Sequence, residues 1–290
     1  MRSLVLFSND LRLNDNDAIN SAIQSNKEIS LLFVYDKELY SKTHGSANLW
    51  WLEKSLFKLK NNLEKKNLTL NIISGQYTET VVKVASKYNF DSVFLNENKH
   101  PDFIKEEENL RIELKKNGIK LHCFNKTNII NPSKILNKTG EPFKVYSPFY
   151  KKCKFDYVQQ KVLVFPKSNI KHFTIDEKSI DTNEIFSSNN NKWSAKLEKY
   201  WEPGEESAIK SMKDFFKTSL FNYKDVRDIP GTLGTSRLSP HLRFGEITTN
   251  QIISNFEFHE NHSLSKHEEH FIKELYWREF AYYILFHFPY

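Results

Sequence analysis

Apolar runs of strand length alternate with segments of helical periodicity through the first 124 residues of the chain. Strands and helices that alternate at these lengths build a parallel sheet covered by helices on both faces. The predicted strands are residues 3–8, 29–35, 68–73, 92–95 and 120–124, and the predicted helices are residues 16–25, 48–59, 79–87 and 103–116. We expect an α/β fold without the usual dinucleotide fingerprint, because no G-x-G-x-x-G is present.

The alternation stops near residue 131, which predicts a second kind of structure. Residues 166–192 hold proline, serine, asparagine and scattered charges, as in a long connector, and they lie within a predicted linker at 131–195. Residues 196–290 contain three helical patterns, at 208–216, 249–256 and 267–288. We therefore expect an α/β domain at 1–130, a linker at 131–195 and an all-α domain at 196–290.

One stretch, residues 234–246, gathers hydroxyl side chains immediately before Ser239-Pro240. Serine favours the N-cap position and proline the first helical position, so we predict a short helix that Gly245 ends. Free N–H groups at a helix N-terminus, beside the hydroxyls of Thr235, Ser236 and Ser239, form an anion site. The stretch favours a diphosphate ligand, and an ordinary capped helix is the alternative.

Charge, cysteine content and hydropathy bound the class of protein. The net charge of +6 and the pI near 9.0 permit a polyanionic partner. Cys123 and Cys153 fit no C-x-x-C or metal spacing, so we expect no metal site and a reducing, cytoplasmic compartment. The apolar run at Leu4–Phe7 is too short for a signal peptide or a membrane span, so no membrane association is expected.

Short motifs occur along the whole chain. They are Phe7-x-x-Asp10-Leu-Arg-Leu13, Trp50-Trp51-Leu-x-x-Ser55-Leu56, Lys144-Val-Tyr-Ser-Pro-Phe149, Trp201-x-Pro-Gly-Glu205, Tyr223-x-x-x-Arg227-Asp228, the 234–246 stretch and Glu274-Leu-Tyr-Trp-Arg-Glu-Phe280. In this order they resemble the photolyase/cryptochrome family, specifically the class I photolyases that act on cyclobutane pyrimidine dimers. The resemblance implies an N-terminal α/β domain with an antenna chromophore and a helical domain that binds FAD.

The resemblance assigns roles to individual residues. It implies that FAD and its diphosphate contact Tyr223, Thr235, Ser236, Arg237, Leu238, Ser239 and Arg278. Glu274 would hydrogen-bond a pyrimidine, Trp277 would stack on the flipped dimer, and Arg227 would contact a DNA phosphate. Glu274, Trp277, Arg278 and Ala281 follow one another at i, i+3, i+4 and i+7, on one helix face. The alternatives are a core position for Trp277 and a core carboxylate partner for Arg278.

The implied activity is that of a deoxyribodipyrimidine photo-lyase, a carbon–carbon lyase that repairs UV-damaged DNA with light. Reduced, excited FAD would donate an electron to the dimer, the ring would split and the electron would return, with Glu274 and Trp277 as catalytic residues. The alternative is a cryptochrome-like blue-light photoreceptor without repair activity. Trp277 favours repair, since plant-type photoreceptors generally lose this stacking residue.

Two expectations concern the antenna and the end of the chain. His44 corresponds to an antenna-side position, but Asp102-Phe103 stands where many members have an Asn-Glu pair for folate. A second chromophore of the folate or deazaflavin type therefore stays open. The family's helical domain continues beyond the last helix found here, so we expect a C-terminally truncated chain. The full-length protein would be a monomer, whereas the truncated chain would associate and be impaired or inert.

Overall fold

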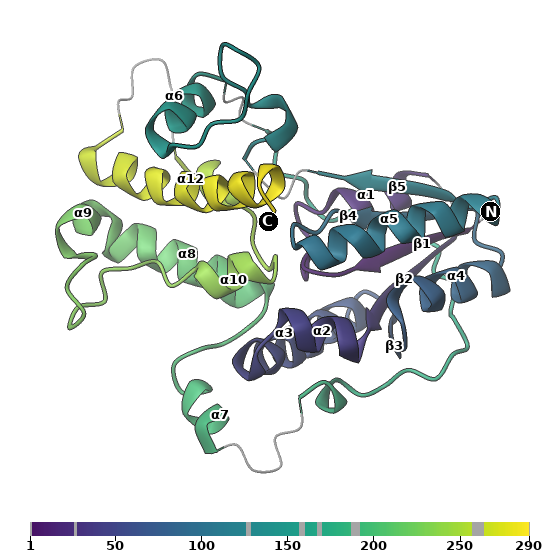
Figure 1. Cartoon of the computed structure of the whole chain (residues 1–290). Coiled ribbons are helices and arrows are strands. Elements are labelled where there is room, and N and C mark those ends of the chain that lie inside the picture. Colours follow the sequence, from purple (N-terminus) through teal and green to yellow (C-terminus); the bar gives the residue numbers. More distant parts are fainter. Residues whose placement is uncertain are drawn as a thin grey trace. The chain divides into compact units, whose positions relative to one another are not determined.

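The computed structural model describes residues 2–25, 28–125, 129–156, 160–166, 170–186, 192–256 and 264–289. The chain forms two compact units, and each unit consists of segments that are separate in the sequence (Figure 1). Unit 1 comprises residues 1–124, 163–205 and 244–246, and unit 2 comprises residues 125–162, 206–243 and 247–290.

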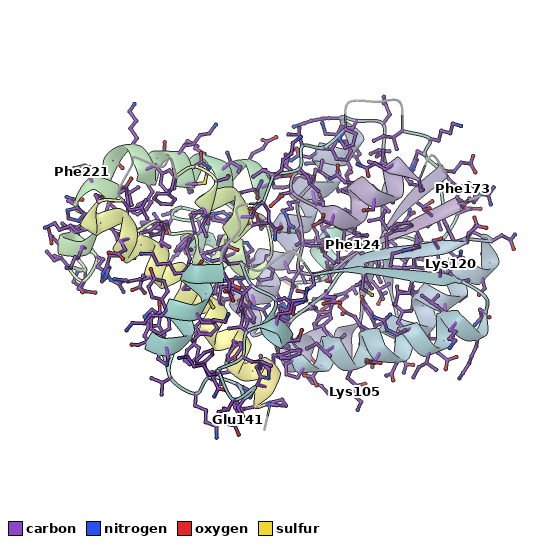
Figure 2. All side chains as sticks on the ribbon, turned by 90° about the horizontal axis from the view of Figure 1, so that it is seen from above. Lys105, Lys120, Phe124, Glu141, Phe173 and Phe221 are labelled. Carbon is purple, nitrogen blue, oxygen red and sulfur yellow. The ribbon has the colours of Figure 1, made fainter. Side chains whose placement is uncertain are left out.

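Unit 1 is organised on a five-stranded sheet in which every neighbouring pair of strands is parallel. The strands are β1 (Arg2–Phe7), β2 (Glu28–Tyr35), β3 (Leu70–Ser74), β4 (Ser92–Asn96) and β5 (Lys120–Phe124), in the spatial order β3-β2-β1-β4-β5. Figure 2 marks the two ends of β5 with Lys120 and Phe124. The α/β prediction is confirmed, and β1 and β2 are mainly apolar because every residue after the first of each strand is buried.

Helices connect the strands of unit 1 (Figure 1). They are α1 (Asp17–Gln24), α2 (Lys37–Thr43), α3 (Ser46–Glu64), α4 (Tyr77–Lys87) and α5 (Pro101–Lys116). The side chain of Asn16 accepts a hydrogen bond from the Ile19 amide and caps α1. Helix α2 is not predicted from the sequence, and Asp36 caps it by accepting from the Leu39 amide.

The segment predicted as a linker divides between the two units. Its first half contains α6 (Tyr146–Asp156), a helix of unit 2 that the sequence analysis does not predict. Its second half lies along the sheet of unit 1, where Ile29 forms a parallel bridge with His172 and the Ile180 amide donates to the Ile72 carbonyl at 2.8 Å. The short helices η2 (Thr182–Glu184) and α7 (Lys192–Leu197) follow. The three-part division at residues 130 and 195 stays a prediction.

The described residues of unit 2 are helical or irregular. Its elements are η1 (Pro132–Lys134), α6, α8 (Glu205–Thr218), η3 (Leu220–Asn222), α9 (Tyr223–Val226), α10 (Ser239–Arg243), α11 (Thr249–Ile253) and α12 (Lys266–His287). The first residue of α8, Glu205, belongs to unit 1 and the rest of this helix belongs to unit 2. Figure 1 shows α12 between α6 on one side and α8 and α9 on the other. Thr248 caps α11 and Ser265 caps α12, each in a capping box.

The core of unit 2 forms around α12. Phe271, Leu275 and Tyr283 of this helix are buried in one cluster with Phe149 of α6 and Phe215 of α8. Among the described residues, no helix has both the length and the apolar character needed to cross a bilayer.

Candidate functional site

Trp277 is a large aromatic side chain on the outer face of α12. It is 47% exposed, so it is not a core residue. Ala281, one turn further along the helix, is also exposed, and Glu274, one turn before it, is partly exposed. An exposed tryptophan flanked by a carboxylate and a small residue offers a flat apolar surface with a hydrogen-bonding group beside it.

One face of the Trp277 indole is covered by Tyr146, the first residue of α6. The two ring centroids are 3.6 Å apart and the planes differ by 8°. The Tyr146 hydroxyl donates to the Lys273 carbonyl at 2.9 Å, and burial raises the pKa of this phenol. Sequence reasoning places Tyr146 only within a family motif and does not pair it with Trp277.

A second cluster joins α9 to the first turns of α12. The guanidinium of Arg227 forms an ion pair with the Glu274 carboxylate and lies 3.2 Å from His270 Nε2. It also stands 5.5 Å above the centre of the Tyr223 ring. The hydrogen bond with Glu274 raises the pKa of Arg227. The structure thus brings together three residues predicted for the site, and adds His270, whose only sequence signal is its i, i+4 spacing from Glu274.

The hydroxyl-rich stretch precedes α10, but the helix begins one residue earlier than predicted. Ser239 is the first helical residue and not the N-cap, since the Leu238 carbonyl accepts the Leu242 amide at 2.9 Å. The chain turns earlier because Arg237 adopts a φ of 55°. The helix ends at Arg243, and Gly245 follows with a φ of 63°, which agrees with its predicted role.

The stretch packs closely against α9. A Cβ atom on Gly234 would lie 2.6 Å from Val226 Cγ2 and 2.9 Å from the Val226 carbonyl oxygen. Thr235 and Ser239 are exposed and Ser236 is half-buried, so their hydroxyls can reach a ligand. Leu238, which lies within this stretch, is buried in the core of unit 2.

Arg278 connects α12 to the last turn of α10. One guanidinium nitrogen lies 3.0 Å from Glu279 Oε1, and another donates to the Leu242 carbonyl at 3.3 Å. Glu279 is fully buried and also accepts the Ile129 amide at 3.1 Å. Arg278 therefore has the core carboxylate partner that the sequence analysis considered as an alternative. A contact between Arg278 and a cofactor stays a prediction.

His44 lies in unit 1 and is buried. Its Nδ1 is 2.7 Å from the Thr43 hydroxyl, and its ring is packed between those of Tyr40 and Phe244, with centroids 5.0 Å and 5.8 Å away. Its predicted antenna contact stays a prediction. Among the described residues, no group of histidine, cysteine or acidic side chains could hold a metal ion.

Unit 1 also contains an open cleft of about 760 Å³ that the sequence analysis does not predict. One wall is a face of α3 with Trp50 and Phe57, and the other comes from residues 181–183, 198 and 201–203, including Trp201. Trp50 Nε1 is buried and has no hydrogen-bond partner within the described parts of the chain. The only signal in the sequence was that Trp50 and Trp201 each belong to a family motif.

Charged side chains line the rim of this cleft. Lys54 pairs with Glu53 at 3.3 Å and with Glu198 at 3.2 Å. Burial raises the pKa of Glu53. A cleft of this volume is large enough for a small organic molecule, and its lining combines three aromatic rings with mostly charged and polar side chains.

The fold and the α12 face define a protein with a parallel α/β unit, a helical unit and an exposed aromatic surface on its last described helix. The family model described as DNA photolyase matches residues 3–167. The chain therefore belongs to the DNA photolyase family, as the motifs predicted.

Known proteins of both kinds in this family are similar to the chain. A deoxyribodipyrimidine photo-lyase of Agrobacterium fabrum is 30% identical over 286 residues, which cover 99% of this chain and 59% of that protein. Cryptochrome-1 of Arabidopsis thaliana is 28% identical over 301 residues, with 99% of this chain and 44% of that protein covered. The chain thus spans only about half the length of these relatives, between 44% and 59%.

Solved structures agree with the fold. The crystal structure of a class III photolyase from Agrobacterium tumefaciens superposes with a TM-score of 0.91 at 30% identity, covering 99% of this chain and 59% of that one. A cryptochrome from Synechocystis has the same fold, with a TM-score of 0.87 at 19% identity and coverage of 99% and 62%. The predicted family and fold are confirmed, whereas the class I subtype is not and stays a prediction.

Proposed function

We propose that this chain provides the α/β unit and the lesion-binding helix of a light-dependent DNA-repair flavoprotein, a deoxyribodipyrimidine photo-lyase. The observation that supports this most is the exposed Trp277, backed on one side by Tyr146 and flanked by Glu274. Extruding a damaged base pair costs a few kcal/mol, and stacking on an aromatic ring returns roughly 1–3 kcal/mol per base. An exposed tryptophan is what such an exchange requires.

The residues near α10 fit the diphosphate of FAD. The hydroxyls of Thr235, Ser236 and Ser239 are exposed or half-buried, and the loop packs against the helix that holds Tyr223. Hydroxyl and backbone N–H groups of this kind would bind the phosphate oxygens. When bound and reduced, FAD supplies the photoexcited electron that opens the cyclobutane ring. Arg237 would add positive charge, and Arg278 would fix α12 next to the cofactor.

Glu274 and Arg227 would then act on different parts of the DNA. The Glu274 carboxylate would accept a hydrogen bond from a pyrimidine N–H, and Arg227 would neutralise a backbone phosphate. Both need to leave the ion pair that they form in the absence of DNA. Ala281 would leave room for the dimer beside the indole.

A second chromophore would suit the cleft on α3. The indoles of Trp50 and Trp201 and the ring of Phe57 line the cleft and can contact a flat heteroaromatic ring. Both a folate and a deazaflavin have such a ring, so the antenna type stays open.

A blue-light photoreceptor without repair activity is the second candidate, since a plant cryptochrome is 28% identical to the chain. A light-driven repair assay separates the two. Under anaerobic conditions, the purified chain is mixed with chemically reduced FAD and an oligonucleotide that contains one thymine dimer, and dimer loss is followed with and without blue light. We expect light-dependent loss, slower than with the longer Agrobacterium fabrum photo-lyase. A chain that binds flavin but leaves the dimer intact at every exposure would favour the photoreceptor.

A further inference from the structure

We infer that Tyr146 is a positioning residue for lesion binding, because it covers one face of Trp277 and leaves the other for a pyrimidine. The inference rests on the proposed function and extends it to a residue on a different helix, α6. The residue would set which face of the indole is available and how the indole is oriented before DNA arrives.

The stack is close and nearly parallel. The centroids of the Tyr146 and Trp277 rings are 3.6 Å apart and the planes differ by 8°, while Trp277 remains 47% exposed. A tryptophan on a helix surface without such a neighbour would exchange between side-chain rotamers. The Tyr146 ring, stacked at this distance, restricts the rotamer exchange of Trp277.

Tyr146 is itself fixed on several sides. Its hydroxyl donates to the Lys273 carbonyl at 2.9 Å, one turn before Trp277 on the same helix. The Tyr150 ring lies 5.7 Å away at an angle of 14°, and the Phe280 ring meets Tyr146 edge-on at 5.8 Å and 70°. Because these contacts hold Tyr146 in place on α6, the tyrosine fixes the position of the Trp277 indole.

The helix that provides Tyr146 is anchored in the core. Phe149 is fully buried, with its ring 5.0 Å from Phe280 and 4.8 Å from Tyr283. Because Phe149 anchors α6 and Phe280 contacts both rings of the stack, the indole is ordered before binding. A pre-ordered side chain loses less conformational entropy on binding, which strengthens the complex. The effect concerns dimer affinity and not flavin binding, since the hydrogen bond and the ring contacts of Tyr146 within the described part of the chain involve α6 and α12 and not the 234–239 stretch.

The opposite role is also testable. Tyr146 could occupy the place that a base takes on Trp277, in which case its removal would strengthen dimer binding. Positioning predicts the reverse, a weaker complex. The two roles therefore predict changes of opposite sign in one measurement.

The experiment measures the affinity of the full chain for two oligonucleotides, identical except for one thymine dimer. The variants are Tyr146→Phe, Tyr146→Leu, Trp277→Ala and the double variant Tyr146→Leu/Trp277→Ala. Phe286→Ala is the matched control, because it removes a half-exposed aromatic ring from the same helix at a distant turn. Leucine keeps much of the buried volume, so Tyr146→Leu is less disruptive than alanine would be.

We expect Tyr146→Leu to lower the preference for the dimer about two- to tenfold, which corresponds to the interaction free energy of one aromatic pair. Tyr146→Phe should stay within about twofold, because it keeps the ring. The double variant should bind the dimer no more weakly than Trp277→Ala alone, since the tyrosine acts through the tryptophan. Phe286→Ala should match the wild type.

Three results would overturn the inference: an unchanged preference in Tyr146→Leu, a stronger preference, or losses that add in the double variant. A wild-type chain without preference for the dimer would instead contradict the proposed function. In that case acrylamide quenching of Trp277 fluorescence tests the positioning role. The Trp277 signal is obtained by subtracting the fluorescence of Trp277→Phe from that of the chain with Trp277. Quenching must increase in Tyr146→Leu, and unchanged quenching would refute the role.

Discussion

Arg227 and Glu274 form an ion pair between α9 and α12, with His270 within 3.8 Å of the same carboxylate. The family resemblance directs these two side chains toward different parts of the DNA, a phosphate and a pyrimidine. In the free protein each is the other's partner. DNA binding therefore has to replace this pair, so the cost of opening it is part of the binding equilibrium.

Replacement of Arg227 by alanine should weaken binding to damaged and undamaged DNA by the same factor. Its guanidinium would neutralise one phosphate, and each such contact contributes about 0.9 to the slope of log affinity against log salt. We expect the slope of the Arg227→Ala variant to be smaller by about that amount. Lys42→Ala, which removes an exposed cation of unit 1 paired with Glu38, is the control. A loss confined to damaged DNA would contradict a phosphate contact.

Negative charge near the start of α10 should reduce flavin binding. Ser236→Asp and Ser239→Asp each place a carboxylate where the diphosphate would lie, and like charges repel at this distance. The ratio of flavin to protein after gel filtration should fall in both variants. Ser41→Asp on α2 introduces the same charge at an exposed position of unit 1 and should leave the ratio unchanged. Equal flavin retention in all three variants would argue against a diphosphate at this loop.

The stability of the chain should fall as pH rises from about 4.5 to 8, owing to Glu107. Burial raises the pKa of this carboxyl from 4.5 to about 8, although the Asn98 amide donates to it at 2.9 Å. The folded state thus keeps a proton that the unfolded chain releases, so the stabilisation is complete below pH 4.5 and is lost as pH rises toward 8.

Urea unfolding at a series of pH values measures this effect. We expect Glu107→Gln to remove roughly 2–4 kcal/mol of the change in unfolding free energy across this range. Glu113→Gln, on the same helix and more exposed, is the control. Parallel curves for Glu107→Gln and the wild type would show that Glu107 does not titrate in this way.

Gly245 should not tolerate a side chain. Its φ is 63°, and a Cβ atom would lie 2.1 Å from the Asn9 carbonyl oxygen. Gly245→Ala should therefore cost more than the 1–2 kcal/mol of the left-handed conformation alone. Gly140→Ala separates the two effects, because Gly140 has a φ of 80° but no atom within 4 Å of its Cβ position. Equal melting temperatures for the two variants would contradict a steric role for Gly245.

The sheet could be predicted because its strands are short, mainly apolar segments that alternate with segments of helical periodicity. Helix α6 was missed although Tyr146, Phe149, Tyr150 and Cys153 follow helical spacing, since Pro148 interrupts the pattern. The proline is tolerated because it lies in the first turn, where the amide has no partner within the helix. Aromatic packing on α12 then stabilises the helix, and such non-local contacts cannot be deduced from periodicity.

The site was predicted in part. Family motifs identified Trp277, Glu274 and Arg227, and helical spacing put the first two on one face. The residues that contact these side chains could be identified only from the structure. The contact of Tyr146 with Trp277, and the buried Glu279 beside Arg278, depend on how segments far apart in the sequence fold together.

The central claim is that the α12 face binds a pyrimidine dimer through Trp277. Its most direct test is the ratio of affinities for damaged and undamaged oligonucleotides, measured for the wild type, Trp277→Ala and the control Phe286→Ala. We predict a clear preference for the dimer in the wild type and in the control. Trp277→Ala should lose about tenfold or more of that preference, as expected for one stacked base. An equal preference in the wild type and Trp277→Ala would contradict the account.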